Sequence, residues 1–419
     1  MEIKRDGQFY RFAAYGFLKN LRFFDPFLIL FFREMGLSFL QIGTLVSVRE
    51  VATNFLELPT GIFADLFGRR LSMVFSMISY LSSFLVFYFF PNFYIYMVAM
   101  IAFAFGEAFR TGTHKAMILE YLRINDMTDI KVHYYGATRA ASQLGSAINA
   151  LIAAFLVFYT GSYKIVFLAS VLPYAVNLVN LMMYPKELDG ELKSGEKRET
   201  LKAFLGIFRS ANALKGVLNS SLYDAFFKVI KEYLQPILKA LALGLPIMLG
   251  FSPEQRTSVI VGVVYFVIFI ATSYASKNAG RLSKKLGNEA RSLNYSYIFG
   301  AILVILSGLF QIVSLQVIAV IVFFLLYILE NFRRPINISY ISDNIDHKTM
   351  ASGLSVESQL KTLLVAIIAP IVGFLADKLG VGMALTVAGM TMLVLFFIVK
   401  LNPPENTKNI EEKSSRTAD

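Results

Sequence analysis

Twelve long apolar stretches constrain the fold of this chain more than any other feature of its sequence. A helix needs about 20 mostly apolar residues to cross a lipid bilayer, and each stretch meets that requirement. Helices suit a membrane because they satisfy their backbone hydrogen bonds internally. The sequence therefore predicts an all-α polytopic membrane protein with twelve transmembrane helices, at residues 11–33, 38–64, 71–90, 93–122, 135–159, 163–184, 213–242, 256–276, 292–313, 316–342, 352–375 and 381–400.

The composition agrees with a membrane protein and excludes several other classes. Of the 419 residues, 56% are hydrophobic and 16% are charged, whereas a soluble protein has about 25% charged residues. There is no cysteine, so disulfides and thiolate metal sites are excluded, and three scattered histidines do not suggest zinc. No phosphate-binding loop or catalytic triad is present. We expect no enzyme activity and no cofactor.

Basic residues indicate how the chain lies in the membrane. The connections on the side of the N-terminus carry most lysines and arginines, whereas those on the other side hold only Arg33, Lys164, Arg256 and Lys378. This asymmetry places both termini in the cytoplasm. The net charge of +11 is explained by basic loops at an anionic leaflet, so a nucleic-acid partner is not expected. We expect a multi-pass protein of the plasma membrane, surrounded by lipid and monomeric.

One polar connection, PKELDGELKSGEKRET, separates the spans into two groups of six. The expected domains are an N-terminal six-helix bundle (1–184), a cytoplasmic linker (185–212), a C-terminal six-helix bundle (213–401) and a polar cytoplasmic tail (402–419). The N-terminus, MEIKRDGQFYR, lacks the short apolar region and cleavage site of a signal peptide, so the first helix should remain in the mature protein.

Internal repeats indicate that the two groups arose by duplication. GIFADLFG begins at Gly61, GRLSKKLG at Gly280 and GFLADKLG at Gly373. EAFR at 107 is echoed by ENFR at 330. More loosely, a Lys, Arg and Pro pattern in the first span is echoed in the seventh. The offsets are similar and point to one duplicated six-helix unit.

Charged residues inside the spans are unevenly distributed. Spans 3, 6, 9 and 12 have none between their ends, which predicts that they form the outer wall. A charge at the bilayer centre costs about 2.5–3.5 kcal/mol, so the charged first helix of each group of three should line a polar cavity. Away from their ends, these four spans hold eight basic residues (Lys19, Arg22, Arg110, Lys115, Lys228, Lys231, Arg333, Arg334) and five acidic ones (Asp25, Glu107, Asp224, Glu232, Glu330).

The duplicated spans and one local motif together resemble the major facilitator superfamily of transporters. GIFADLFGRR, residues 61–70, is similar to that family's signature between the second and third helices, Gly-x-x-x-Asp-x-x-Gly-Arg-Arg/Lys. The resemblance implies two pseudo-symmetric six-helix bundles around a central site. It also implies a cytoplasmic latch in which Asp65 and the arginines engage the eleventh helix. In GRLSKKLG the aspartate position is Lys284, so a latch in the second half must differ.

The candidate site residues fall into three groups. The excess of positive charge predicts a substrate with a carboxylate, phosphate or sulfonate, bound by Lys19, Arg22, Arg110, Lys228, Lys231 and Arg333. Candidate proton carriers are Asp25, Glu107, Glu330 and Asp224. Expected gating or latch residues are Gly61, Asp65, Gly68, Arg69, Arg70, Arg139 and Glu357. The alternative for Glu107 with Arg110, and for Arg22 with Asp25, is a structural pair that only neutralises itself within one helix.

We therefore expect a secondary transporter that moves a small polar, anionic organic solute by alternating access, with protons as a candidate coupling ion. The alternative is an antiporter that exports drugs or amphipathic metabolites in exchange for protons. The fifth span, RAASQLGSAINALIAAFLV, lacks the proline of the exporter motif, which argues against that alternative. A membrane sensor or lipid-moving protein with the same fold is a further alternative.

Overall fold

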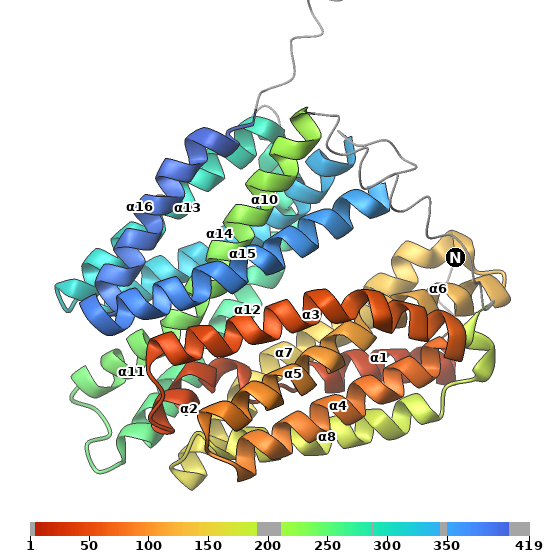
Figure 1. The fold of residues 1–419 in the computed structure, drawn as a ribbon, viewed down its shortest axis with the longest axis horizontal. Coiled ribbons are helices and arrows are strands. Elements are labelled where there is room, and N and C mark those ends of the chain that lie inside the picture. The colour runs from red at the N-terminus through yellow and green to blue at the C-terminus, as the bar shows by residue number, and fades with distance from the viewer. Residues whose placement is uncertain (1–4, 191–210, 286–288, 344–349, 402–419) are drawn as a thin grey trace, which may run out of the picture.

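The computed structural model describes residues 5–190, 211–285, 289–343 and 350–401, and these residues form helices without strands (Figure 1). Residues 191–210 of the expected linker and the expected tail, 402–419, lie outside the described residues. The first group of helices comprises α1 (Gly7–Lys19), η1 (Asp25–Phe27), α2 (Leu28–Glu34), α3 (Phe39–Phe67), α4 (Arg69–Phe89), α5 (Phe93–Arg110), α6 (Thr113–Ile124), η2 (Thr128–Ile130), α7 (Lys131–Thr160), α8 (Ile165–Met182) and η3 (Lys186–Asp189).

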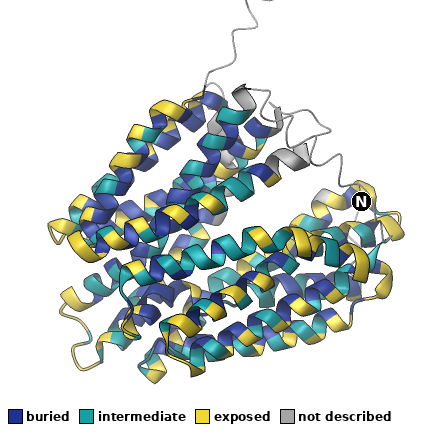
Figure 2. Ribbon diagram, viewed as in Figure 1, coloured by how far each residue is buried: buried dark blue, intermediate teal, exposed yellow. Residues whose placement is uncertain are grey.

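The second group follows residue 210 and begins with α10. It comprises α10 (Ala211–Ile230), η4 (Lys231–Tyr233), α11 (Leu234–Gly244), α12 (Pro253–Lys285), α13 (Glu289–Ile312), α14 (Gln316–Asp343), α15 (Met350–Leu379) and α16 (Val381–Val399). Figure 1 shows the first group, coloured red to yellow, packed beneath the second group, coloured green to blue. Figure 2 shows that buried residues run along the inside of each group, while exposed residues lie on the outer faces and in the loops.

Each of the twelve expected spans coincides with a helix or a pair of helices. Within the described residues, nine helices are long and apolar enough to cross a membrane. The other three expected spans, 11–33, 38–64 and 213–242, are broken or carry internal charges. The twelve-span count therefore remains a prediction for these three. Many apolar side chains on the helices are exposed, for example Phe155, Val394 and Phe397, which suits a surface that faces lipid.

The first and seventh spans are both interrupted. In the first span, the helix ends with α1 and begins again at η1. In the seventh span, the α-helix is interrupted by the 3-10 turn η4. Neighbouring helices satisfy the backbone groups that the first break leaves free: the Asn149 amide donates to the carbonyl of Arg22 at 3.0 Å, and the Phe23 N–H donates to the hydroxyl of Ser170 at 3.2 Å. Irregular backbone at membrane depth is tolerated where protein supplies such partners.

The two groups of helices meet along two pairs, α3 with α15 and α7 with α12. We call the end of the bundle that holds Gly7, Arg69 and residues 184–190 the linker end, and the other the far end. At the far end, a Cβ added to Gly43 would lie 2.4 Å from the carbonyl oxygen of Ala369, and one added to Gly373 would lie 2.3 Å from that of Phe39. Such short distances require glycine at both positions. The helices are therefore in backbone contact at the far end.

Further hydrogen bonds follow the α3–α15 contact toward the linker end. Ser47 donates to the carbonyl of Ala366 at 2.6 Å, and Asn54 donates to that of Gln359 at 3.1 Å. Beyond Asn54 the same face of α3 continues with Leu58, which is 69% exposed. The two helices therefore separate toward the linker end, so the halves are closed at the far end and apart at the linker end.

Two side chains close the far end across the halves. The carboxylate of Asp377, at the end of α15, accepts from the N–H groups of Phe39 and Leu40 at 2.9 and 2.7 Å, and so caps α3. Gln235, which is fully buried on α11, accepts from the Ile29 N–H at 2.8 Å and donates to the carbonyl of Asp25 at 3.0 Å. Both contacts must break if the far end is to open.

Candidate functional site

A cavity of about 520 Å³ lies between the two halves. Its lining comes from the broken segments of spans one and seven, from α3, α5, α7, α10, α14 and α15, and from the 3-10 turns η1 and η4. Five of the expected substrate-binding residues line it, namely Lys19, Arg22, Arg110, Lys228 and Lys231. Two of the expected proton carriers, Asp25 and Glu107, line it as well. The structure thus brings residues from distant spans to one central space.

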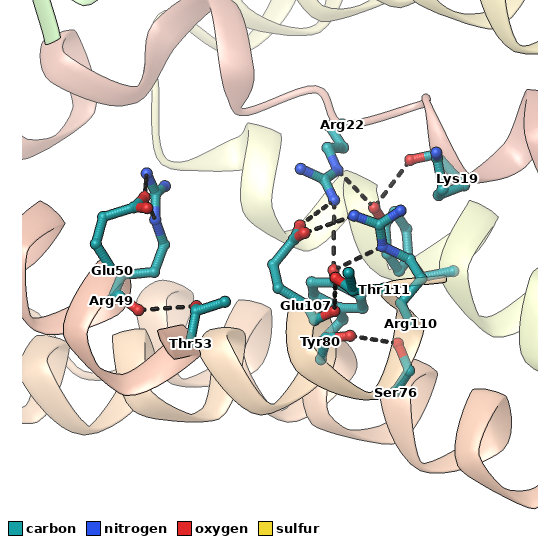
Figure 3. A network of polar contacts seen from close by, with 12 residues as sticks. Lys19, Arg22, Arg49, Glu50, Thr53, Ser76, Tyr80, Glu107, Arg110 and Thr111 are labelled. Atoms are coloured by element: carbon teal, nitrogen blue, oxygen red, sulfur yellow. Dashed lines mark hydrogen bonds and ion pairs between the residues drawn. The ribbon is translucent and has the colours of Figure 1, made fainter. Parts of the chain in front are cut away.

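Glu107 lies between two arginines on one wall of the cavity (Figure 3). Arg22 Nη2 is 2.5 Å from Glu107 Oε1, and Arg110 Nη2 is 2.5 Å from Glu107 Oε2. We call these three residues the Glu107 cluster. The expected local pair of Glu107 with Arg110 is present, but Arg22 pairs with Glu107 rather than with Asp25. Two cations share one carboxylate, so the cluster carries an excess of one positive charge.

Two buried tyrosines hold the arginines of the Glu107 cluster. Arg22 Nε donates to the Tyr174 hydroxyl at 2.9 Å, and Arg110 Nε donates to the Tyr80 hydroxyl at 3.3 Å. These tyrosines come from α8 and α4, the two helices that the sequence predicted as outer wall because they lack charges. That prediction missed them because a tyrosine adds a polar group to an apolar helix without adding charge.

A second cluster of charges lies on α3 and α10. Glu50, only 4% exposed, accepts from Arg49 Nη2 at 2.8 Å and from Lys228 Nζ at 2.7 Å. We call these three residues the Glu50 cluster. Lys228 belongs to the second half of the chain, so this cluster joins the halves. The sequence predicted Lys228 as a substrate ligand, and nothing in the local pattern indicates that Glu50 lies across the interface from it.

Two further charges of the cavity lie at the break in the seventh span. Lys231 Nζ is 3.5 Å from the Glu232 carboxylate, and Gln235 donates to the same carboxylate at 2.9 Å. The amino group of Lys19 has no hydrogen bond or ion pair with another described residue. Lys19 therefore places an unpaired amino group beside the Glu107 cluster, with which it shares the lining of the cavity.

The second copy of the repeated motif, ENFR, does not form the contacts that the first copy, EAFR, forms. Arg333 is fully buried, does not line the cavity and forms no ion pair with Glu330 among the described residues. Its guanidinium instead donates to Ser296 and to the carbonyl of Leu293, and its Cζ lies 4.3 Å from the centre of the Tyr223 ring. Arg333 therefore binds protein groups rather than the cavity contents. The duplicated sequence could not reveal this, because the neighbouring helices differ.

Asp224 and Glu330 form a second group of acidic residues away from the cavity lining. Asp224 Oδ1 and Glu330 Oε2 are both buried and have no hydrogen-bond partner among the described residues. The two carboxylates come from α10 and α14 and are near enough to interact electrostatically. The two carboxylates also interact electrostatically with three basic residues, Lys361, Arg333 and Arg334, but form no ion pair with them. Buried carboxyl oxygens without partners are costly when charged.

The latch motif lies at the linker end, where the halves are apart. Asp65 is exposed, and a Cβ added to Gly61 would meet nothing within 4 Å. Gly68 has a φ of +99°, which favours glycine, and lies against Asp189. Asp189 accepts from the N–H of Arg70 at 2.6 Å, and so caps α4. The motif is thus held by the chain that follows α8, and among the described residues Asp65 forms no hydrogen bond or ion pair with α15.

The other expected gate residues have different surroundings. Arg69 Nη1 lies 4.0 Å from the Glu120 carboxylate. Arg139 is exposed on α7. Glu357 on α15 lies 3.8 Å from Lys361 Nζ and accepts weakly from the Ser220 hydroxyl at 3.4 Å. Within the described residues, no three histidine, cysteine, aspartate or glutamate side chains are grouped so that they could hold a metal ion.

Comparison with known proteins gives matches to transporters. A sequence profile of the Major Facilitator Superfamily matches residues 12–360. The uncharacterized MFS-type transporter YxaM of Bacillus subtilis (strain 168) is 33% identical over 107 residues, which are 25% of this chain and 26% of that protein. The chain therefore matches about a quarter of the length of this relative.

Solved transporter structures share the fold over nearly the whole chain. The nucleoside transporter NupG has a TM-score of 0.75 at 12% identity, covering 94% of this chain and 98% of its own. A bacterial homolog of the human lysosomal transporter Spinster, inward-facing and unoccupied, has a TM-score of 0.72 at 13% identity, covering 96% and 100%. A POT family transporter in complex with 5-aminolevulinic acid has a TM-score of 0.67 at 14% identity, covering 94% and 93%. At these identities the likeness concerns the fold alone.

Proposed function

The chain belongs to the major facilitator superfamily, and from that premise we propose that it is a secondary transporter for a small anionic organic solute. The solute binds in the central cavity, and the two halves expose that cavity to each side of the membrane in turn. The arrangement seen here is closed at the far end. If the linker end is cytoplasmic, as the basic residues predict, this is the inward-facing arrangement.

The observation that carries the proposal is the excess positive charge of the Glu107 cluster. Arg22 Nη1 and Arg110 Nη1 form no hydrogen bond with another described residue, and both residues line the cavity. Guanidinium groups bind carboxylates and phosphates with paired, charge-assisted hydrogen bonds. The tyrosines fix the two guanidiniums before a ligand arrives, which lowers the entropic cost of binding.

A ligand screen on the purified full chain in detergent tests this proposal. Ligand binding raises the free energy of unfolding by RT ln(1 + [L]/Kd), so a thermal shift detects even millimolar affinity at tens of millimolar ligand. We expect shifts with small organic anions such as succinate and butyrate, and no shifts with neutral or cationic analogues. Arg110→Gln should weaken anion binding about tenfold or more, since hydrogen bonds to charged groups contribute about 1.5–3 kcal/mol.

The matched control is Lys131→Gln, which removes an exposed positive charge at the start of α7, outside the cavity lining. It should leave anion affinity unchanged. Shifts only with hydrophobic cations, or equal anion binding by the wild type and Arg110→Gln, would contradict the proposal.

We further propose that Asp224 and Glu330 carry the coupling proton. Glu107 is less suited, because both of its oxygens are bound by arginines, which keep it ionised. The buried, unpaired oxygens of Asp224 and Glu330 are better satisfied if the pair holds a proton. Glu330→Gln mimics the protonated form. In proteoliposomes, this variant should abolish proton-driven accumulation of the solute but retain solute exchange. Unchanged proton-driven accumulation would contradict the assignment.

A further inference from the structure

The Glu107 cluster and the Glu50 cluster have the same arrangement of charges, and one arginine of each lies near the same ring, that of Phe103. Each consists of one carboxylate between two cations, so each carries an excess of one positive charge. All six residues line the same cavity. A solute with a single anionic group could neutralise the excess charge of one cluster and would leave that of the other.

Phe103 lies close to one guanidinium of each cluster. The guanidinium carbon of Arg22 lies 5.6 Å from the centre of the Phe103 ring, and that of Arg49 lies 5.8 Å from the same centre. The separation of the two guanidiniums cannot exceed the sum of these distances. Phe103 itself lines the cavity and presents an apolar surface between the two charges. A short carbon chain with an anionic group at each end matches this arrangement.

Both clusters also keep hydrogen-bond donors for a ligand. Arg49 uses Nε and Nη2 for Glu50, and its Nη1 has no hydrogen-bond partner among the described residues, as is the case for Arg22 Nη1. Figure 3 shows Arg49 with Glu50 apart from the group formed by Arg22, Glu107 and Arg110. Each cluster can therefore donate to one further anionic group without losing its glutamate.

Three other carboxylates, those of Asp25, Glu57 and Glu232, line the same cavity. Asp25 and Glu232 come from the 3-10 turns at the breaks, and Glu57 lies further along α3 toward the linker end, where Lys361 acts on it. Glu232 is already paired with Lys231. The lining as a whole still has an excess of basic residues, because Lys19, Lys231 and Lys361 line the cavity as well.

We propose that the transported solute is a dianion with two separated anionic groups, one bound by the Glu107 cluster and the other by the Glu50 cluster across Phe103. This inference rests on the proposed function and adds the substrate class. Because Lys228 of the Glu50 cluster belongs to the second half, the second anionic group of the solute contacts both halves at once. The first group contacts residues of the first half alone.

The test compares succinate with succinamate on the purified full chain by isothermal titration calorimetry at neutral pH. The two compounds have the same shape, but a neutral amide replaces one carboxylate in succinamate. We expect succinate to bind about tenfold or more tightly, as expected for hydrogen bonds to a charged group. Arg49→Gln should weaken succinate binding more than succinamate binding and so reduce this preference. Glu50 keeps Lys228 as a partner in that variant, which favours normal folding.

Lys228→Gln provides a second variant from the other half and should also reduce the preference. Equal affinities of the wild type for succinate and succinamate would overturn the inference while leaving the proposed function intact. A preference that persists undiminished in both variants would overturn it as well. Binding of neither compound, nor of butyrate, would refute both the inference and the proposed function.

Discussion

Removing the carboxylate of Asp377 should shift the transporter away from the arrangement seen here. Asp377 accepts from two N–H groups in the first turn of α3, at 2.9 and 2.7 Å, across the boundary between the halves. The next N–H of that turn, from Gln41, is already bound by the Ser38 side chain. Asp377→Ala therefore leaves α3 partly capped and folded, and removes a contact that exists only while the far end is closed.

The size of the effect follows from the energetics of helix caps. Loss of a capping side chain costs about 0.5–2 kcal/mol. Asp377 is exposed, and water replaces it when it is removed, so the lower half of that range applies. A cost of about 0.5–1 kcal/mol changes the ratio of the two arrangements about two- to fivefold. The minor, far-end-open population should increase by that factor.

Cysteine labelling can measure this population, because the chain contains no cysteine of its own. Ala376→Cys places a thiol at a site that is 4% exposed in the closed far end and does not line the cavity. Its reaction rate with a membrane-impermeant maleimide reports how often the far end opens. The rate should rise about two- to fivefold when Asp377→Ala is added, in line with the population shift.

Two controls accompany this measurement. Asp377→Asn keeps an oxygen that can accept one of the two N–H groups and should give a smaller increase. Lys378→Ala changes an exposed neighbour without touching α3 and should give none. An unchanged labelling rate in Asp377→Ala, with intact folding, would refute the view that this cap stabilises the closed far end.

Three further outcomes follow from the structure. Gly43→Ala places a Cβ 2.4 Å from the carbonyl oxygen of Ala369 and should destabilise the closed far end by about 1–3 kcal/mol. It should therefore raise the rate of far-end labelling more than Asp377→Ala does. Equal labelling rates in the two variants would contradict this prediction. Asp189→Ala removes the cap of α4 and should lower the thermal midpoint by a few degrees, measured by differential scanning fluorimetry, with unchanged anion affinity. Tyr174→Phe removes the hydrogen bond to Arg22 Nε and should weaken succinate binding about two- to tenfold, measured by calorimetry; full affinity would show that the tyrosine does not position the arginine.

The sequence predicted the helical membrane fold well because the apolar stretches and the repeats are local signals. It also predicted the pair of Glu107 with Arg110, since residues three apart on a helix are neighbours. It could not predict that Arg22 crosses to Glu107 or that Lys228 reaches Glu50. Those contacts depend on how the helices pack, and no local pattern encodes that packing.

The second copy of the charge motif shows the limit of reasoning from duplication. ENFR repeats EAFR, yet Arg333 turns into the protein between two tyrosines, whereas Arg110 faces the cavity. Asp377 shows the opposite case. The repeated Ala-Asp of GFLADKLG was visible in the sequence, but its role as a cap on α3 required the position of a helix more than 300 residues away.

The different surroundings of Gly43 and Gly61 show which end of α3 has room to approach α15. Both glycines lie on the face of α3 that is turned toward α15. The backbone of Ala369 occupies the space beside the Cα of Gly43, whereas the space beside Gly61 is open. A bulky side chain at Gly61 would thus act as a wedge that is harmless in the arrangement seen here and obstructs only closure of the linker end. In the arrangement seen here, α3 is packed against α15 at Gly43 and has free space at Gly61.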